Sequence, residues 1–319
     1  MSSRRDGEDS CPPDSNDQLR QGLAGVRALL LDMDGVVVLR GRPLPGAGDA
    51  VATLVARGIP FRFLTNSSLH DRQTLARLLT AGGVTVDAAQ IVTALSASAA
   101  LASRRWPGRA LYVLAAPDAL REFAGQRLLS DDEAAAAARE AESRDGASGP
   151  PVAAVIVGDA GAQFTFARLN TAFRLVRAGA RLVAVHRNRW WLTPDGITLD
   201  SGAFVRAIEY AAGRRALLAG KPAPSFFEAA LASLGMPPGP PDAPGTWRRR
   251  DVLMVGDDLQ TDVGAARRVG LRGAFVLSGK HGPADLAAAV RRAASGVAND
   301  VLLPDVIASS LSEIVAALD

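Results

Sequence analysis

The stretch that decides the fold reads Val26-Arg27-Ala28-Leu29-Leu30-Leu31-Asp32-Met33-Asp34-Gly35. Its apolar part is typical of a fully buried strand in a parallel sheet, whose carboxyl end opens onto the crevice where such sheets hold ligands. The two carboxylates at that end serve no packing need, and they repel each other unless a cation or a shared proton intervenes. A polar turn that closes the strand is the alternative, because Asp and Gly are common turn residues.

Length and composition limit the class of protein. The chain has 319 residues, of which 48% are hydrophobic, enough for two domains or for one domain with a large insertion. No apolar run approaches the roughly 18 residues of a membrane helix, so we expect no membrane association. Cys11 is the single cysteine, which excludes an internal disulfide and fits a cytoplasmic protein. Lys and Arg outnumber Asp and Glu by only 36 to 33, which argues against nucleic-acid binding.

From residue 26 onward, apolar strands alternate with helical stretches. We expect further strands within residues 60–64, 108–115, 151–158, 181–185, 216–219, 252–255 and 275–277. This alternation predicts an α/β fold with a doubly wound, mainly parallel sheet. Residues 1–25 are rich in polar residues, Gly and Pro, so we expect a disordered N-terminal extension there.

Polar groups follow four of the expected strands, and parallel strands bring such ends to one edge. These groups are Asp32 and Asp34, Thr65 and Asn66, Lys221, and the acids Asp257, Asp258 and Asp262. Asp32 can attack phosphorus as a carboxylate nucleophile, while Asp34 protonates the leaving oxygen and later deprotonates water. Thr65 and Lys221 suit phosphoryl oxygens. Asp32, Asp257 and Asp262 offer the hard oxygen ligands that Mg²⁺ prefers.

Each of these residues also has a purely structural interpretation. Asp262 fits the first turn of a helix, where the macrodipole favours an acid, and Asp258 fits a helix cap. Lys221 can be an exposed loop residue and Asn66 a turn residue. Their combination at four strand ends favours the functional interpretation.

The four segments resemble the four motifs of the haloacid dehalogenase-like phosphohydrolases. The motifs correspond to residues 32–36, 65–68, 220–222 and 256–262. The long interval between the second and third motifs is similar to the type IIA branch, which carries a C2 cap. Residues 158–160, 164–166 and 204–210 resemble the phospholysine/phosphohistidine/inorganic pyrophosphate phosphatase subgroup of that branch.

The resemblance implies a Rossmann-like catalytic core, residues 26–94 and 201–319, interrupted by an inserted α/β C2-type cap, residues 95–200, and a homodimer formed through the cap. It also implies that Asp32 is the nucleophile and Asp34 the acid/base. Phosphate binding falls on Gly35, Thr65, Asn66 and Lys221. The implied Mg²⁺ ligands are Asp32, the Asp34 carbonyl and Asp257, with Asp258 and Asp262 as further candidates.

One segment departs from many type IIA caps, which carry an Asn-x-Asp turn where this chain has residues 186–191, His-Arg-Asn-Arg-Trp-Trp. Arg187 and Arg189 share one face of an extended segment. They therefore face either an anionic substrate or solvent. Trp190 and Trp191 point to opposite sides, so at least one of them is expected to pack against the cap sheet.

We therefore expect a Mg²⁺-dependent phosphatase that hydrolyses a small phosphorylated substrate through a phospho-aspartate on Asp32. A large cap restricts entry and favours small molecules. The alternatives are a phosphotransferase or phosphomutase, a protein phosphohistidine or phospholysine phosphatase, and a non-catalytic phosphate-binding regulator. A dehalogenase is the weakest alternative, because it would have no need of the acid at Asp34.

Overall fold

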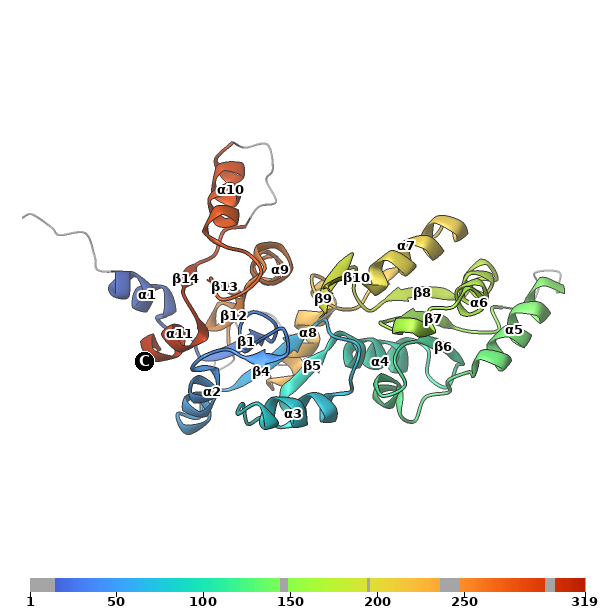
Figure 1. Cartoon of the computed structure of the whole chain (residues 1–319), viewed down its shortest axis with the longest axis horizontal. Coiled ribbons are helices and arrows are strands. Elements are labelled where there is room, and N and C mark those ends of the chain that lie inside the picture. Colours follow the sequence, from blue (N-terminus) through green and yellow to red (C-terminus); the bar gives the residue numbers. More distant parts are fainter. Residues whose placement is uncertain (1–14, 144–148, 194–195, 236–246, 296–301, 319) are drawn as a thin grey trace, which may run out of the picture.

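The computed structural model describes residues 15–143, 149–193, 196–235, 247–295 and 302–318, which form two lobes side by side along the long axis (Figure 1). Each lobe is built around its own parallel sheet. Helices cover the sheets: α1 Ser15–Leu23, α2 Ala47–Ala56, α3 Arg72–Ala81, α4 Ala94–Arg105, α5 Asp131–Ser143, α6 Phe166–Arg177, α7 Ser201–Ala212, α8 Pro224–Ser233, α9 Ala265–Arg268, α10 Pro283–Ala294 and α11 Leu311–Ala317. Within the described residues, no helix is both long and apolar enough to cross a membrane.

The larger lobe contains a six-stranded sheet in the order β14-β13-β12-β1-β4-β5, with every neighbouring pair parallel. Its strands are β1 Ala28–Asp32, β4 Phe61–Thr65, β5 Ile91–Thr93, β12 Val252–Gly256, β13 Arg272–Val276 and β14 Val306–Ala308. The chain winds outward from β1 on one side and from β12 on the other. The crevice at the carboxyl ends of β1 and β12 is therefore the topological switch point, where such folds hold ligands. The predicted doubly wound α/β fold is confirmed.

Strand β1 is buried on both faces, as its uninterrupted apolar sequence predicts. Leu29 and Leu31 point into a hydrophobic cluster with α2, α3 and α11, whereas Leu30 points into a second cluster with α4, α8 and α9. This alternation follows from the two-residue period of a strand. It holds β1 rigidly in the centre of the sheet and so fixes the position of Asp32 at its end.

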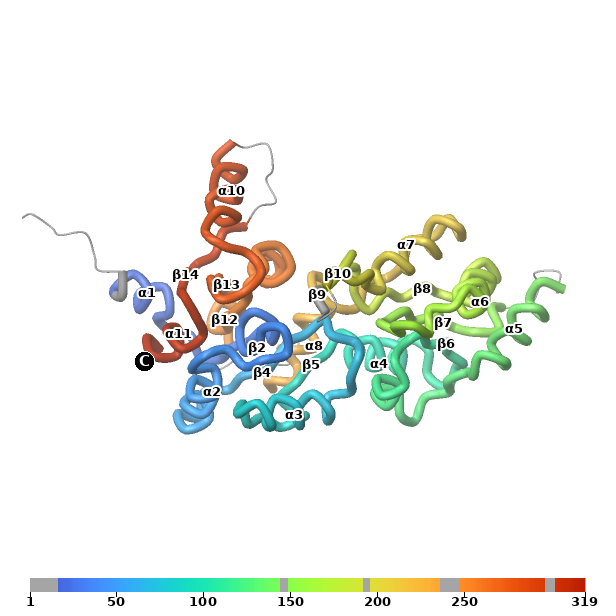
Figure 2. Tube along the Cα trace, viewed as in Figure 1, coloured from blue at the N-terminus to red at the C-terminus, as the bar shows by residue number. Residues whose placement is uncertain are grey.

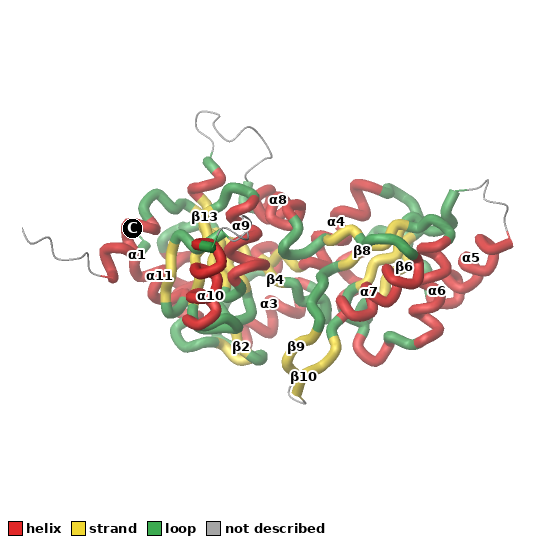
Figure 3. Tube along the Cα trace, turned by 90° about the horizontal axis from the view of Figure 1, so that it is seen from above, coloured by secondary structure: helices red, strands yellow, loops and turns green. Residues whose placement is uncertain are grey.

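The smaller lobe contains a four-stranded parallel sheet in the order β11-β8-β7-β6. Its strands are β6 Leu111–Leu114, β7 Ala154–Val157, β8 Arg181–Ala184 and β11 Leu217–Leu218. Two antiparallel hairpins complete the fold: β2 Val38–Leu39 with β3 Arg42–Pro43, and β9 Trp190–Thr193 with β10 Gly196–Leu199. The second hairpin lies at the edge of the smaller lobe that faces the larger one (Figure 3).

The expected start of the second core segment at residue 201 needs correction. Val205 and Ile208 of α7 pack into the hydrophobic cluster of the smaller lobe, and β11 pairs with β8. The chain therefore returns to the larger lobe only after Leu218. The two-residue strand β11 is too short for sequence patterning to assign it to a sheet.

The disordered extension expected for residues 1–25 is wrong for residues 15–23, which form helix α1. Leu19 and Leu23 are buried against β14 and α11, so helix α1 packs against the last described strand and helix (Figure 2). The Arg272 guanidinium donates to the carbonyls of Gly22 and Ala24 at 3.0 and 2.9 Å. With two buried leucines among mostly polar residues, this helix gives a weak sequence signal. Residues 1–14 lie outside the described chain.

Candidate active site

Three of the four predicted segments meet where three neighbouring strands end. Asp32 is the last residue of β1, Thr65 is the last of β4, and Asp257 directly follows β12. Lys221 reaches the same place from the other lobe, because it follows β11 in the four-stranded sheet. The prediction that all four segments leave one sheet is therefore wrong for Lys221, although its side chain does join the others.

The centre of the site is a buried cluster of three acids and one lysine. Asp32, Asp257 and Asp262 each place a carboxylate oxygen within 4.8 Å of the others. Lys221 Nζ lies 2.7 Å from Asp32 Oδ1 and 2.8 Å from Asp262 Oδ1. One ammonium group leaves three carboxylates with an excess of negative charge. The donor set therefore fits a hard divalent cation such as Mg²⁺, which would relieve the repulsion among the acids.

The cluster has the electrostatics of a functional site. Burial raises the pKa of Asp32, Asp257 and Asp262, and repulsion from the neighbouring acids adds to this effect. Burial alone would lower the pKa of Lys221, but the attraction of Asp262 and Asp32 outweighs it and raises that pKa. Crowded acids with raised pKa values lower the stability of the folded state at neutral pH. Such a cluster is typical of a functional site, because it contributes nothing to stability.

Asp257 is held in place by close backbone packing. Gly35 has φ 80° and Gly279 lies opposite it, and a Cβ on either residue would overlap the Asp257 carboxylate. The backbone N–H of Lys280 donates to Asp257 Oδ2 at 2.5 Å. Gly35 N–H already donates to the Val38 carbonyl at 2.7 Å, so this donor is not free for the phosphate contact predicted for Gly35. Gly35 instead permits the close approach of Asp257.

Asp34 lies beyond the buried cluster. Its side chain is exposed, unlike that of Asp32. Desolvation by the surrounding protein raises its pKa, and the charge of Lys221 opposes this rise. A carboxyl group at the mouth of the site, with a pKa above its ordinary value, can exchange a proton with a bound molecule and with water.

Thr65 and Asn66 connect the loops of the two lobes. Lys221 N–H donates to Asn66 Oδ1 at 2.9 Å, and Asn66 Nδ2 donates to the Lys221 carbonyl at 3.1 Å. This reciprocal pair fixes the backbone that carries the lysine, so Asn66 acts on the position of Lys221. Thr65 is buried and its Oγ1 accepts from Ser67 N–H at 3.0 Å, which leaves its hydroxyl proton able to donate to a ligand.

The contacts of Asp258 are those of a helix cap. Its Oδ1 accepts from the N–H groups of Gln260 and Thr261 at 2.9 and 3.0 Å, at the start of the π-helical turn Leu259–Gly264. Its Oδ2 lies 2.8 Å from Lys280 Nζ. Burial opposes these contacts, but they lower the pKa of Asp258 to about 2. Asp258 lies outside the three-acid cluster, so the structure favours a cap over a metal ligand. Lys280 gave no signal in the sequence.

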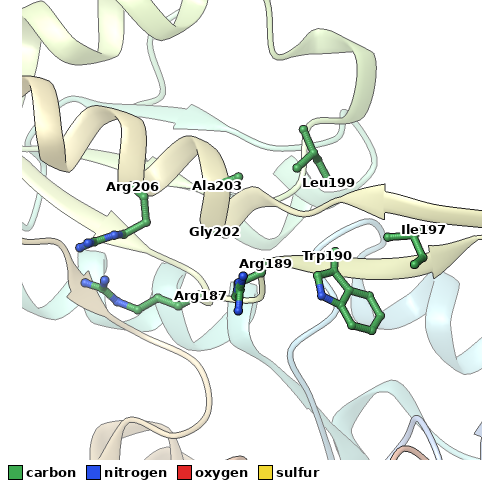
Figure 4. A pocket seen from close by; sticks show the side chains of 8 residues that line it. All are labelled: Arg187, Arg189, Trp190, Ile197, Leu199, Gly202, Ala203 and Arg206. Atoms are coloured by element: carbon green, nitrogen blue, oxygen red, sulfur yellow. The ribbon is translucent and has the colours of Figure 1, made fainter.

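Arg187 and Arg189 differ in the structure. The Arg187 guanidinium forms two hydrogen bonds with Glu209, at 2.6 and 3.2 Å, and donates to the Ala216 carbonyl. Arg189 is exposed, and among the described residues no carboxylate pairs with it. Both side chains line a pocket at the β9–β10 hairpin (Figure 4).

A buried polar network next to the site was missed from the sequence. His186 follows β8, and its Nε2 lies 3.4 Å from Ser68 Oγ, 3.2 Å from Ser201 Oγ and 3.6 Å from Asp200 Oδ1. Ser68 Oγ also accepts from Asp159 N–H at 2.9 Å. Ser68 follows the predicted phosphate-binding loop, whereas the other members belong to the smaller lobe. The network therefore joins the two lobes close to Asn66. The members come from four separate segments of the sequence, and only the fold brings them together.

The comparisons with known proteins agree with this geometry. A family model described as haloacid dehalogenase-like hydrolase matches residues 29–128, and a second model of the same kind matches residues 218–303. These two regions include all the predicted segments, from Asp32 to Asp262.

Individual proteins match most of the chain. Haloacid dehalogenase-like hydrolase domain-containing protein 2 of Bos taurus is 32% identical over 260 residues, which cover 82% of this chain and 87% of that protein. Phospholysine phosphohistidine inorganic pyrophosphate phosphatase of Xenopus laevis is 31% identical with the same coverage. Among solved structures, glycerol phosphate phosphatase from Mycobacterium tuberculosis in complex with magnesium has a TM-score of 0.73 and 26% identity, covering 92% of this chain and 77% of that one.

Proposed function

Because the chain belongs to the haloacid dehalogenase-like hydrolases, we propose that it is a Mg²⁺-dependent phosphatase that hydrolyses a small phosphate monoester through a phospho-aspartate on Asp32. The observation that carries this proposal is the placement of the Asp32 carboxylate at the switch point of the sheet, 2.7 Å from Lys221 Nζ, with Asp34 exposed beside it. The names of the matched relatives support hydrolysis of phosphoryl compounds.

The residues can perform both halves of the reaction. An Asp32 carboxylate oxygen attacks phosphorus while Asp34 donates its proton to the leaving oxygen, and the ester P–O bond breaks. Asp34 then takes a proton from water, which attacks the same phosphorus atom and releases inorganic phosphate and the free Asp32 carboxylate. Lys221 stabilises negative charge on the transferring group throughout. Asn66 holds Lys221 in position for this role.

Mg²⁺ would be held by the carboxylates of Asp32, Asp257 and Asp262, with the Asp34 carbonyl as a further ligand. When bound, the ion supplies positive charge that neutralises the phosphoryl oxygens. The acids within 4.8 Å of one another and the magnesium complex of a similar structure support this assignment. A homodimer through the smaller lobe, a cytoplasmic location and the naming of that lobe as a C2 cap stay predictions.

The proposal is tested by measuring phosphate release from a panel of small phosphate monoesters, pyrophosphate and phosphohistidine, with Mg²⁺ and with EDTA. We expect release that requires the metal and that disappears in Asp32→Asn, whereas the control variant Asp17→Asn, an exposed acid on α1, keeps the wild-type rate. Absence of release from the whole panel by folded wild-type protein would overturn the proposal. Release from phosphohistidine alone would instead favour a protein phosphatase.

A further inference from the structure

The β9–β10 hairpin forms a pocket that lies outside the acid cluster. Its volume is about 480 Å³, and eight residues line it: Arg187, Arg189, Trp190, Ile197, Leu199, Gly202, Ala203 and Arg206. Arg187 and Arg206 lie at one end of this pocket and Trp190 and Ile197 at the other, with Arg189 between them (Figure 4). The pocket therefore combines a cationic part and an apolar part.

The cationic part carries more positive charge than its acid neutralises. Arg187 and Arg206 both contact Glu209, whose Oε2 lies 2.9 Å from Arg206 Nη1. Glu209 is buried, and these arginines lower its pKa to about 2 against the effect of burial, so it is ionised. Arg189 is the third arginine, and no described carboxylate pairs with it. Three guanidinium groups against one carboxylate leave the pocket cationic, with Arg189 available to a ligand.

The apolar part is one face of the hairpin. Trp190 lies directly opposite Leu199 in the antiparallel register, and Ile197 follows two residues away on the same face. These side chains are 48%, 66% and 74% exposed, although they are large and apolar. Gly202 closes the floor, because a Cβ there would overlap the Asn188 carbonyl. An exposed apolar face beside unpaired positive charge is typical of a binding surface.

The chain that leads into the pocket contacts the two loops that carry Lys221 and Asn66. The Val185 carbonyl accepts from Gly220 N–H at 2.8 Å, one residue before Lys221. His186 contacts Ser68, two residues after Asn66. Two residues of extended chain reach about 7 Å, so Arg187 starts within that distance of Val185, which itself contacts the loop that presents Lys221.

We propose that this pocket holds the leaving group of the substrate, and that this group carries a second anion, a carboxylate or phosphate, next to an apolar or aromatic part. The proposal rests on the phosphatase function proposed above. Arg189 forms a charge-assisted hydrogen bond with the second anion, and Trp190 and Leu199 contact the apolar part. Arg187 forms part of the cationic wall of the pocket, where Glu209 holds its guanidinium.

The test compares kcat/KM for phenyl phosphate and 4-carboxyphenyl phosphate, and comparison of this ratio between wild type and variants cancels the small difference in acidity of the two leaving phenols. Wild-type protein should favour the carboxylated substrate by on the order of tenfold, the effect of one charge-assisted hydrogen bond. Arg189→Ala should remove this preference and Arg189→Lys should restore part of it. Arg181→Ala is the matched control, because Arg181 is an exposed arginine of strand β8 in the same lobe and lies outside the pocket, and it should keep the wild-type ratio. An unchanged ratio in Arg189→Ala would overturn the proposal.

A binding measurement separates this proposal from the phosphatase function. Calorimetry with the non-hydrolysable 4-carboxybenzylphosphonate needs no turnover, and its Kd should rise on the order of tenfold in Arg189→Ala. That result without any phosphate release would support the pocket and reject the proposed reaction. Equal affinity of wild type and variant would reject the pocket.

Discussion

At the scale of single residues, Asp32 and Asp34 are two positions apart but lie in different environments. Asp32 is buried against Lys221, while the side chain of Asp34 is exposed. In the proposed reaction this difference suits Asp32 to act as the nucleophile and Asp34 to exchange protons with water. The motif in the sequence predicts both roles, and the structure adds that only Asp32 is buried.

Replacement of Asp34 should affect substrates according to their leaving group. We expect Asp34→Asn to reduce kcat/KM by about 10²–10⁴ for an alkyl phosphate such as glycerol phosphate, whose leaving oxygen needs a proton. The loss in kcat/KM should be smaller for 4-nitrophenyl phosphate, since nitrophenolate leaves without one. Steady-state kcat/KM values report the step that releases the leaving group and not the later hydrolysis common to both substrates, so an equal loss for both would contradict a general-acid role.

The sequence predicts the site residues better than their contacts. Asp32, Lys221, Asp257 and Asp262 come together, as their positions after predicted strands suggest. The cap formed by Asp258 agrees with the structural interpretation of that residue. The reciprocal hydrogen bonds of Asn66 and the contact of Lys280 were not predicted, because they depend on loop conformations that side-chain type does not specify. The roles assigned to these residues in catalysis stay predictions until variants are measured.

At the scale of elements, helix α1 contributes to the larger lobe. Leu23 is 3% exposed, and Gly22 is so close to Val306 that a Cβ would lie 2.9 Å from its Cγ2. Leu23→Ala should lower the free energy of unfolding by about 2–4 kcal/mol, through lost burial and the cavity left behind. Urea unfolding measures this, with the exposed Arg20→Ala as a control expected within about 0.5 kcal/mol of wild type. Equal effects of the two substitutions would show that α1 does not pack on the lobe.

Glu209 of α7 should make a pH-dependent contribution to stability. Its folded pKa of about 2 lies below its ordinary value of 4.5, so its ion pairs stabilise the protein above pH 4.5 and lose this effect as the pH falls toward 2. Because Arg206 is largely exposed, we expect Glu209→Gln to cost only about 2 kcal/mol at pH 7. This difference should shrink progressively below pH 4.5.

Urea unfolding of wild type and variant between pH 7 and pH 3.5 checks this expectation. The exposed acid Asp132→Asn is the control. A stability difference that stays constant over this range would contradict the ion-pair account.

At the scale of the whole molecule, two lobes build one site. The larger lobe supplies the three acids and the smaller lobe supplies Lys221, because β11 runs toward the switch point of the other sheet. Alternation of strands and helices predicts the α/β fold, although the two outer strands of the six-stranded sheet, β5 and β14, were not among the expected strands. It does not predict which short segment belongs to which sheet, as β11 and α7 demonstrate, because both lobes have the same local pattern.

The acid cluster should couple stability to metal. In the proposed site Mg²⁺ binds only the folded protein, so saturating MgCl₂ should raise Tm, with about 2.7 kcal/mol of stabilisation at a hundred times Kd. Asp257→Asn should lose this shift, and its metal-free form should be at least as stable as metal-free wild type, since one of three crowded charges is gone. Thermal unfolding with MgCl₂ and with EDTA measures both effects. A full Mg²⁺ shift in the variant would place the metal elsewhere.

The central claim, a covalent intermediate on Asp32, is tested most directly by trapping it. The enzyme is mixed with substrate and Mg²⁺, quenched in acid during turnover, and treated with borohydride, which reduces an aspartyl phosphate to homoserine. Peptide mass spectrometry should then find homoserine at position 32. Homoserine at another aspartate, or Mg²⁺-dependent turnover that persists in Asp32→Asn, would contradict the account.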